Sequence, residues 1–406
     1  MRPKRWPPLW LRVPAGTRDV LPEEAESLRR LERRLLGLFG RWGYREVRTP
    51  VLEFLSTVER GVGVEGPDAL FVLVDRTGEL LALRPEMTVP IARLVATHGK
   101  DRARLSYVAE VFRVRDTSRG EEREFVQAGV ERIGDRGPDA DAEVVALAVW
   151  ALREAGVEGF RIGLGHAGLL RGLLEAAGLD AEDQHAAKLL LYRRDFVTLQ
   201  GLLEGAPVTI REAILHLPSW RGPDALDRAA RLGIAPGALE EVEHLLEALR
   251  PYGVGGEVEV DLGLIRDFEY YTGIVFEGYA QGVGRPVLGG GRYDGLLMRF
   301  GTDRPAVGFA LHLNRLLPTL PPSAPSTVLS VVYVPRFRDL AVRLALALRE
   351  EGIPVLTDPW PQPEVHAPCI MLEDEQARVC SRQGRERVVI PELHLLVQEA
   401  IEAWRS

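Results

Sequence analysis

The chain has 406 residues, of which 46% are hydrophobic and 27% charged, so it is long enough for about two or three packed domains of ordinary globular composition. Its formal net charge of -8 disfavours a general electrostatic grip on nucleic acid, which needs a basic surface. The only two cysteines, Cys369 and Cys380, form no CxxC pair, and the eight histidines lack metal-ligand spacing. The sequence therefore predicts no metal site, no cofactor and no nucleic-acid partner.

The start of the chain is basic but broken by prolines, and it lacks the apolar core of a signal peptide. The longest uncharged apolar run, residues 144–152, is too short to span a bilayer. We therefore expect a cytoplasmic protein with no membrane partner.

The first half of the chain predicts a mixture of helices and paired strands. Residues 22–41 have the periodicity of an amphipathic helix, with glutamates near its start, where the helix dipole favours acids. Residues 70–86 predict a hairpin, and residues 88–98 a short helix. Two long β-like segments follow, at residues 104–116 and 123–134.

Another helix is expected at residues 142–153, with Asp139 and Asp141 just before it. Residues 166–252 then show no convincing strand and predict several short helices. Strand patterns resume at residues 257–280, and residues 305–317 predict a strand that leads into a helix.

Prolines at positions 318, 321, 322 and 325 mark a linker. The predicted fold is α+β: a mainly antiparallel sheet flanked by helices over residues 1–320, interrupted by a helical insertion at residues 166–252. A small α/β domain is expected at residues 326–406, because a strand, a helix and further strands alternate there.

Polar residues on the two long β-like segments suggest a binding cavity. Alternation places Gln127 and Glu131 on one face of the second segment, and Arg113 and Arg115 share a face of the first. Charged side chains on a covered sheet face need a partner or a ligand. The alternative is an open sheet with one solvated face, which is common in antiparallel sheets.

Two further segments carry groups of the same kind. Glu86 lies where a strand ends and a helix begins, so it is either a cation ligand or an ordinary acidic residue at a helix start. Arg266, Tyr270 and Tyr271 add a cation and two phenols. Together these groups suit an amino acid: carboxylates for its ammonium, arginine for its carboxylate, and a phenol with an acid for a polar side chain.

Seven segments of the chain follow one another in this order: GTRDVLP (16–22), GYREVRTPVLE (43–53), LRPEMT (83–88), VFRVRDTSRGEEREFVQAGVE (111–131), RDFEYYTGIVFE (266–277), GGGRYDGL (289–296) and VGFALHLNRL (307–316). In order and spacing they closely resemble the catalytic core of histidyl-tRNA synthetase, over residues 14–318. The resemblance implies a class II synthetase-like fold with a six-stranded antiparallel sheet, and a homodimer formed through the first motif around Pro50.

The positions that match the family's histidine pocket are occupied by the expected residues. The resemblance implies that Glu86, Thr88 and Gln127 hold the α-amino group of histidine. It places Arg113 and Arg266 near the carboxylate and the reacting phosphate.

The resemblance also implies partners for the imidazole ring. Glu131 and Tyr271 match these partners, and Tyr270 lies beside them. The implied ligand is therefore histidine.

The positions that match the family's ATP site differ from its pattern. Arg115 stands where the family has a glutamate, and Glu121 where it has an arginine that reaches the phosphates. His312 replaces a glycine and Asn314 a glutamate, whereas Arg315 is retained. Exchanging an acid and a base in one phosphate site is severely unfavourable for adenylate formation.

A retained amino-acid pocket beside a degraded ATP site resembles the regulatory subunits of ATP phosphoribosyltransferase, a family paralogous to the synthetase. That resemblance implies a subunit with no catalytic residues, which joins a short-form catalytic chain in a hetero-octamer. It also implies that the complex performs the first step of histidine biosynthesis and that histidine acts as its feedback inhibitor.

Two alternatives remain open at this point. One is an active histidyl-tRNA synthetase with an atypical ATP site, which predicts ATP turnover and a basic surface for tRNA. The other is a stand-alone histidine sensor with a different partner.

Overall fold

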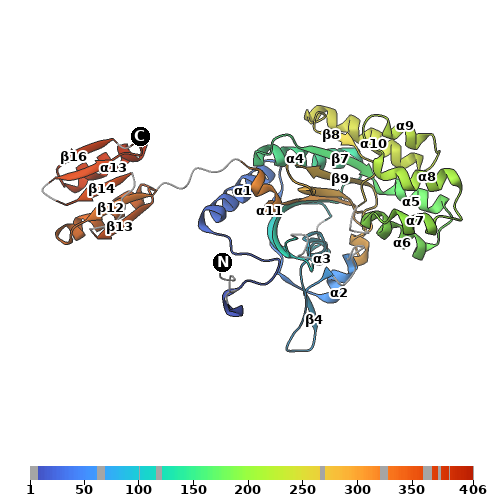
Figure 1. Cartoon of the computed structure of the whole chain (residues 1–406), viewed down its shortest axis with the longest axis horizontal. Coiled ribbons are helices and arrows are strands. Elements are labelled where there is room, and N and C mark those ends of the chain that lie inside the picture. Colours follow the sequence, from blue (N-terminus) through green and yellow to red (C-terminus); the bar gives the residue numbers. More distant parts are fainter. Residues whose placement is uncertain are drawn as a thin grey trace, which may run out of the picture. The chain divides into compact units, whose positions relative to one another are not determined.

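The structure is a computed structural model, which describes residues 8–61, 69–99, 101–115, 121–265, 270–320, 328–359, 368–373, 376–383 and 385–405. The chain divides into two compact units, Met1–Pro322 and Ser323–Ser406 (Figure 1). Each unit has its own apolar core.

The larger unit is built on an eight-stranded sheet. Its six central strands are antiparallel, and a short strand pairs in parallel at each edge. The strands, in spatial order, are β1 (Arg45–Glu46), β5 (Ala103–Phe112), β6 (Glu124–Ile133), β11 (Ala306–His312), β10 (Leu288–Arg292), β9 (Ile274–Tyr279), β7 (Arg161–His166) and β8 (Val258–Val260).

The six antiparallel strands at the centre of the sheet match the number that the resemblance implies, and β1 and β8 are added at its edges. β1 pairs with β5 over two residues and β8 with β7 over three. β8 lies within residues 257–280, where strand patterns were expected, but segments this short have too few residues for an alternating pattern to give their bounds.

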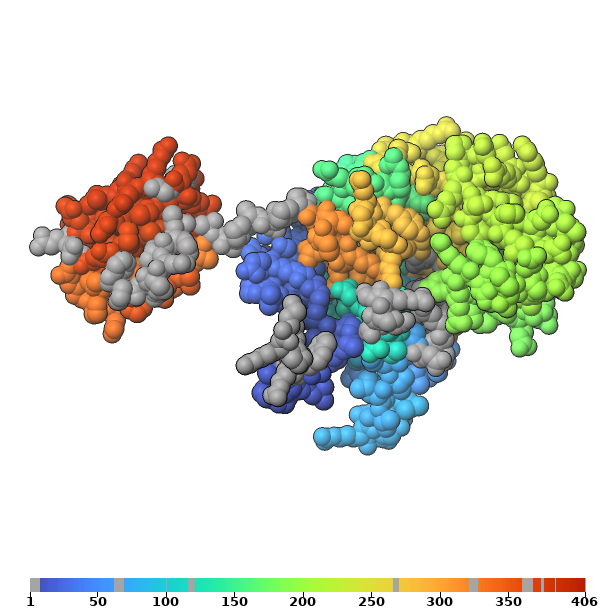
Figure 2. Space-filling view, viewed as in Figure 1, coloured from blue at the N-terminus to red at the C-terminus, as the bar shows by residue number. Residues whose placement is uncertain are grey.

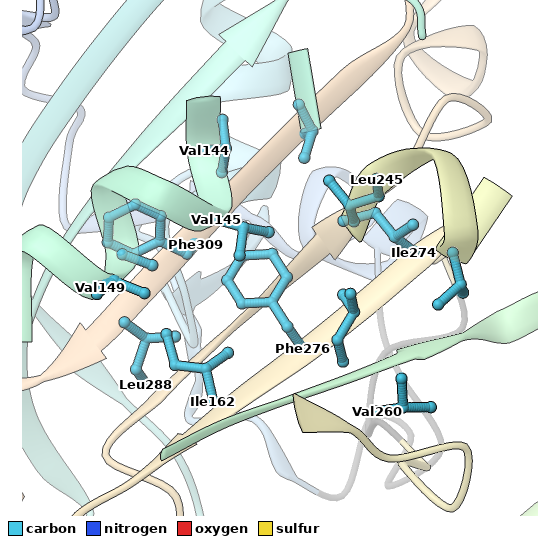
Figure 3. Close-up of a cluster of buried hydrophobic side chains, with 14 of the residues drawn as sticks. Val144, Val145, Val149, Ile162, Leu245, Val260, Ile274, Phe276, Leu288 and Phe309 are labelled. Carbon is cyan, nitrogen blue, oxygen red and sulfur yellow. The ribbon is translucent and has the colours of Figure 1, made fainter. Parts of the chain in front are cut away.

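One face of the sheet is covered by α1 (Pro22–Arg41), α4 (Pro138–Ala155) and α10 (Pro236–Leu249). Figure 3 shows Val145 and Val149 of α4 beside Phe276 and Phe309 of the sheet, all of them almost completely buried. Burial of each such side chain contributes roughly 1.5–3 kcal/mol. This apolar layer supports the sheet from one side, and the polar side chains of the site lie on its other face.

The start of α4 differs from the sequence-based expectation. The helix begins at Pro138, so Asp139 and Asp141 lie in its first turn and not before it. Proline suits the first turn because its fixed backbone angle is helical and no donor is lost there. Asp141 is buried and binds Arg292 of β10, with Arg292 Nη2 2.6 Å from Asp141 Oδ1.

The insertion is helical, as predicted, and its apolar residues continue the core of the larger unit. Asp180 and Asp195 cap two of its helices by accepting hydrogen bonds from Asp183 N and Thr198 N. Figure 1 shows the insertion beyond one end of the sheet. Its helices before α10 are α5 (Ala167–Ala176), α6 (Ala181–Arg193), α7 (Phe196–Leu202), α8 (Val208–His216) and α9 (Ala225–Ala230).

The opposite face of the large sheet is partly covered by α3 (Thr88–His98), which packs with Tyr107 and Val111 of β5. The segments just before α3 in the chain form a small sheet, in the order β2 (Leu52–Phe54), β4 (Leu80–Leu83) and β3 (Val72–Val74). The predicted hairpin forms β3 and β4, and Figure 2 shows it projecting from the surface of the unit. The remaining helices of this unit are α2 (Leu55–Val58) and α11 (Leu313–Leu316).

The smaller unit is a five-stranded sheet with two helices. Cys369 and Cys380 lie opposite each other on neighbouring strands as free thiols. No helix in the part of the chain that the structure describes is long and apolar enough to cross a membrane. The sheet order is β13 (Val355–Pro359), β12 (Leu329–Tyr333), β14 (Cys369–Leu372), β15 (Ala377–Cys380) and β16 (Glu386–Val389), and the helices are α12 (Arg338–Glu350) and α13 (Leu393–Arg405).

Candidate functional site

A cavity of about 840 Å³ lies in the larger unit, on the sheet face opposite α4. Its volume is in the usual range of ligand sites in proteins. Arg266, another predicted site residue, lies outside the described residues. Eleven other predicted site residues line the cavity: Glu86, Thr88, Arg113, Arg115, Glu121, Gln127, Glu131, Tyr270, Tyr271, His312 and Arg315.

The acidic end of the cavity is organised around Glu131, which is 1% exposed. Thr88 Oγ1 donates to Glu131 Oε1 at 2.9 Å, and the Tyr293 hydroxyl donates to Oε2. Burial raises the pKa of Glu131 to about 8; the two hydrogen bonds oppose the rise and the nearby Glu86 adds to it. A cation or a strong donor that entered here would therefore be favoured.

Glu86 has two roles in the structure. Its carboxylate accepts hydrogen bonds from the backbone N–H groups of Thr88, at 2.6 Å, and Val89, at 2.7 Å, and so caps α3. Glu86 also lines the cavity, and burial raises its pKa. The hydrogen bonds fit the interpretation of Glu86 as an acidic residue at a helix start, and its role as a cation ligand stays a prediction.

Gln127 provides an unused acceptor at this end. Its side chain is 8% exposed, and Oε1 has no hydrogen-bond partner within the described residues. A buried amide oxygen without a partner is costly, and native structures usually provide one, often a ligand. The atom is thus placed to accept a hydrogen bond from a bound ammonium group.

Glycines make room for these side chains. A Cβ atom on Gly308 would lie 1.8 Å from Glu131 Oε2, and one on Gly129 would lie 2.5 Å from the Tyr107 hydroxyl oxygen. In the glycine run at residues 289–291, a Cβ on Gly291 would lie 2.8 Å from Tyr271 Cδ1, so backbone and ring are in close contact.

Sequence reasoning missed two phenols of the site. Tyr107 and Tyr293 line the cavity, and burial raises the pKa of both hydroxyls. Tyr107 lies on β5 in the expected alternation, and Tyr293 stands in the segment GGGRYDGL, so each was within a segment that the sequence had already singled out.

Arg113 and Arg115 do not lie on a strand, which corrects the sequence-based placement. β5 ends at Phe112, and Arg113 and Arg115 follow it. The prediction assumed that the strand continues, because the apolar alternation carries on to Val114. Arg113 still faces the cavity, where its Nε donates to Pro85 O at 2.8 Å.

The basic end of the cavity contains Arg115 and Glu121, whose charges are the reverse of those in the synthetase pattern. Glu121 binds two arginines at once: Oε2 is 2.8 Å from Arg115 Nη1, and Oε1 is 2.9 Å from Arg285 Nη1. The imidazole of His312 stacks on the Phe125 ring, with centroids 4.0 Å apart and planes at 6°. One face of the Phe125 ring is thus covered by a residue of the chain itself.

The arrangement therefore has an acidic, phenolic end and a basic end. The acidic end can hold an ammonium group and a polar ring, and Arg113 can meet a carboxylate. At the basic end, the Glu121 carboxylate is held by ion pairs with Arg115 and Arg285. This combination favours binding of an amino acid over transfer of an adenylate.

The chain is similar to several known proteins. The sequence model of the family described as histidyl-tRNA synthetase matches residues 16–316. The ATP phosphoribosyltransferase regulatory subunit of Moorella thermoacetica is 46% identical over 361 residues, covering 86% of this chain and 92% of that protein. The regulatory subunit of Symbiobacterium thermophilum is 47% identical over 315 residues, covering 75% and 79%.

The chain belongs to the family of ATP phosphoribosyltransferase regulatory subunits. A solved structure described as an ATP phosphoribosyltransferase regulatory subunit/histidyl-tRNA synthetase from Bacillus halodurans matches with a TM-score of 0.80 and 32% identity, over 91% of this chain and 100% of that one. The expected class II synthetase-like fold is confirmed. The expectation of a regulatory subunit, and not an aminoacylating enzyme, is confirmed by the names of its relatives.

Proposed function

We propose that this regulatory subunit binds free histidine at the acidic end of the cavity and conveys its presence to a short-form catalytic ATP phosphoribosyltransferase chain in the cytoplasm. The observation that carries the proposal is the convergence of buried acceptors on one space: the Glu131 carboxylate, the Glu86 carboxylate and Gln127 Oε1. In the complete enzyme, bound histidine inhibits the first step of histidine biosynthesis.

The proposed pose follows from charge. The ammonium group of histidine lies against Glu86, Thr88 and Gln127, and its carboxylate faces Arg113 and, by the family resemblance, Arg266. These groups satisfy a zwitterion without leaving a buried charge unpaired.

The imidazole ring lies between Glu131 and Tyr271, with Tyr270 beside it. The two tyrosine rings are in contact, with centroids 4.9 Å apart. A site that hydrogen-bonds both ring nitrogens rejects an apolar ring of similar size strongly, because Glu131 would be left buried against it. This is the basis for preferring histidine over phenylalanine.

An active synthetase is disfavoured by the basic end. Glu121 already holds Arg115 and Arg285, and His312 covers a face of Phe125. A stand-alone sensor is disfavoured by the family, whose relatives are named as subunits of an enzyme.

Inhibition requires that histidine bind one state of the complex more tightly than another. Linkage is reciprocal. The factor by which the catalytic chain changes the affinity of this subunit for histidine equals the factor by which histidine changes its affinity for the catalytic chain. Typical coupling free energies of about 1–3 kcal/mol correspond to roughly 5–150-fold effects.

A homodimer through the larger unit is part of the proposal, within a hetero-octamer with the catalytic chain. The pairing register puts Leu52, Phe54 and Leu73 on one face of the small sheet with Leu81 and Leu83. The first three are 46%, 54% and 43% exposed. An apolar sheet face that projects into solvent favours a self-complementary interface with a second copy.

The test is paired calorimetry on the purified chain: histidine is titrated first, and ATP is then titrated with histidine present. We expect saturable histidine binding, and neither ATP binding nor pyrophosphate release. Tyr271→Phe is expected to weaken histidine binding while the chain still assembles with the catalytic subunit. ATP turnover in the presence of histidine would instead establish that the chain is an active synthetase.

A further inference from the structure

The only two cysteines of the chain face each other in the smaller unit. Cys369 is the first residue of β14 and Cys380 the last of β15, and the register of these antiparallel strands places them directly opposite each other as free thiols. Opposed residues of an antiparallel pair have Cα atoms about 4.5–5.5 Å apart, and disulfides span Cα separations of about 4.4–6.8 Å. The backbone therefore needs no large rearrangement for a bond between the two sulfurs.

The two thiols lie on the face of the sheet that is turned away from its helices. Ile370 and Val379, the neighbours of the cysteines along each strand, belong to the core that contains α12 and α13. Side chains alternate between the faces of a strand, so Cys369 and Cys380 share the opposite face. The pair is thus separate from the packing between the sheet and its two helices.

The two thiols differ in how easily a reagent from solvent reaches them. Cys369 is 3% exposed, whereas Cys380 is partly exposed. Burial, followed by the neighbouring Cys380 and Glu386, raises the pKa of Cys369 to about 12. Only the thiolate form of cysteine is a good nucleophile, so Cys369 does not react first. Chemistry at this pair therefore begins at Cys380.

We propose that Cys369 and Cys380 form a reversible disulfide by exchange with a low-molecular-weight disulfide, which makes the smaller unit an oxidation-responsive module. Cys380 loses its proton and its sulfur attacks one sulfur of the reagent, whose S–S bond breaks; half of the reagent takes up a proton and leaves as a thiol. Cys369 then loses its proton and its sulfur attacks the sulfur of Cys380, and the second half of the reagent leaves as a thiol. The two cysteines lose two electrons, which the reagent gains, and excess thiol reverses the exchange.

The second step is helped by the first. In the mixed disulfide, Cys380 has neither a charge nor a thiol proton, so its part in raising the pKa of Cys369 is removed. Because Cys369 is the buried partner, it attacks from inside and the reagent leaves toward solvent.

The bond would close the hairpin of β14 and β15 at its open end, because the two cysteines are the paired residues farthest from the connection between the strands. A cross-link there prevents the strand ends from fraying, and it restricts the unfolded chain over residues 369–380. Oxidation is therefore expected to raise the melting temperature of the smaller unit by about 5–15 °C.

The experiment is incubation of the reduced full chain with oxidised glutathione, followed by alkylation of the remaining thiols and mass spectrometry. The parent is expected to lose both free thiols and about 2 Da, with no glutathione retained. Tryptic cleavage after Arg349, Arg378 and Arg382 puts the cysteines on different peptides, so the bond appears as residues 350–378 linked to residues 379–382. Two thiols that react only after denaturation, a stable glutathione adduct beside a free Cys369, or a disulfide-linked dimer would each overturn the proposal.

Two variants separate the roles of the thiols. Cys369→Ala should accumulate one glutathione on Cys380, because no second thiol displaces it, and Cys380→Ser should react at least about tenfold more slowly. Equal reaction rates of the two variants would overturn the assignment of Cys380 as the first nucleophile. Scanning calorimetry should show the rise in melting temperature for the oxidised parent but not for Cys369→Ala with its glutathione. An equal rise in both would overturn the cross-link, and if Cys369→Ala does not fold, the peptide map of the parent still decides.

Discussion

Replacement of Glu131 by glutamine is predicted to stabilise the protein while it removes histidine binding. The carboxylate of Glu131 is buried beside Glu86, and its pKa is raised to about 8. The folded state therefore holds a proton on Glu131 more tightly than the unfolded chain does, where the ordinary value is 4.5. Glutamine has nearly the same shape and never bears the charge.

The size of the effect depends on pH. The contribution of Glu131 to stability is greatest below pH 4.5, decreases as the pH rises, and is constant above about pH 8. At about 1.4 kcal/mol per pH unit, Glu131→Gln should exceed the parent in unfolding free energy by about 2 kcal/mol at pH 6 and by up to about 5 kcal/mol at pH 8.5.

The assay is denaturant unfolding of both proteins at pH 5, 6, 7 and 8.5, with histidine titrated calorimetrically at pH 7. Glu143→Gln is the control, because Glu143 accepts from the Tyr44 hydroxyl at 2.9 Å and pairs with Arg104 and Arg132. Burial opposes ionisation of Glu143, but Arg104 and Tyr44 hold its pKa below the ordinary value, so its contribution is lost as pH falls. Glu143→Gln should therefore destabilise at neutral pH by about 1–3 kcal/mol.

The reasoning is refuted if Glu131→Gln is less stable than the parent at pH 8.5. That result would mean that the donors at Thr88 and Tyr293 outweigh the cost of burying the charge. A stable variant that still binds histidine with the parent's affinity would remove Glu131 from the proposed imidazole site.

Three further substitutions test separate parts of the structure. Gly308→Ala should displace Glu131, so that calorimetry shows histidine binding weakened by about tenfold or more and urea unfolding shows a free energy of unfolding lower by about 1–3 kcal/mol. Parent-like behaviour in both assays would contradict the close contact. Arg292→Leu leaves Asp141 buried without its partner and should cost about 3–5 kcal/mol in unfolding free energy, whereas a cost under 1 kcal/mol would show that the pair is dispensable. Phe54→Asp places a charge on the exposed apolar face, so sedimentation should show a monomer; an unchanged dimer would place the interface elsewhere.

Long periodic elements of the fold were predictable from the sequence alone. α1, α3, β5 and β6 were expected within a few residues of their observed bounds, because each repeats its apolar pattern several times. The bounds of the edge strands β1 and β8 were not, because two or three residues carry no period and their pairing is decided by the neighbouring strand.

The positions of the site were predictable through the family resemblance, but their contacts were not. Tyr293 reaches Glu131 across 162 residues of sequence. Arg285 stands in a turn that no motif marked, and only the fold brings it to Glu121. A residue that acts through a distant partner leaves no local pattern, so the balance of charge at the basic end could be worked out only from the structure.

That balance also decides what restoring the synthetase charges would do. Exchanging Arg115→Glu together with Glu121→Arg rebuilds an ion pair of reversed polarity, but the new arginine would then face Arg285, which now binds Glu121. The imidazole of His312 would still lie on Phe125.

We therefore expect the double exchange to give no tRNA charging and no pyrophosphate release with histidine and ATP, measured by adenylate-dependent isotope exchange. Adding His312→Gly to the exchange uncovers the Phe125 ring, so ATP binding should appear in calorimetry before any charging activity does. If the double variant alone charges tRNA, the two exchanged charges are sufficient to explain the loss of adenylation. Neither the ring stack nor Arg285 would then be a barrier to it. Equal ATP affinity with and without His312→Gly would show that the stacked imidazole is no barrier to the base.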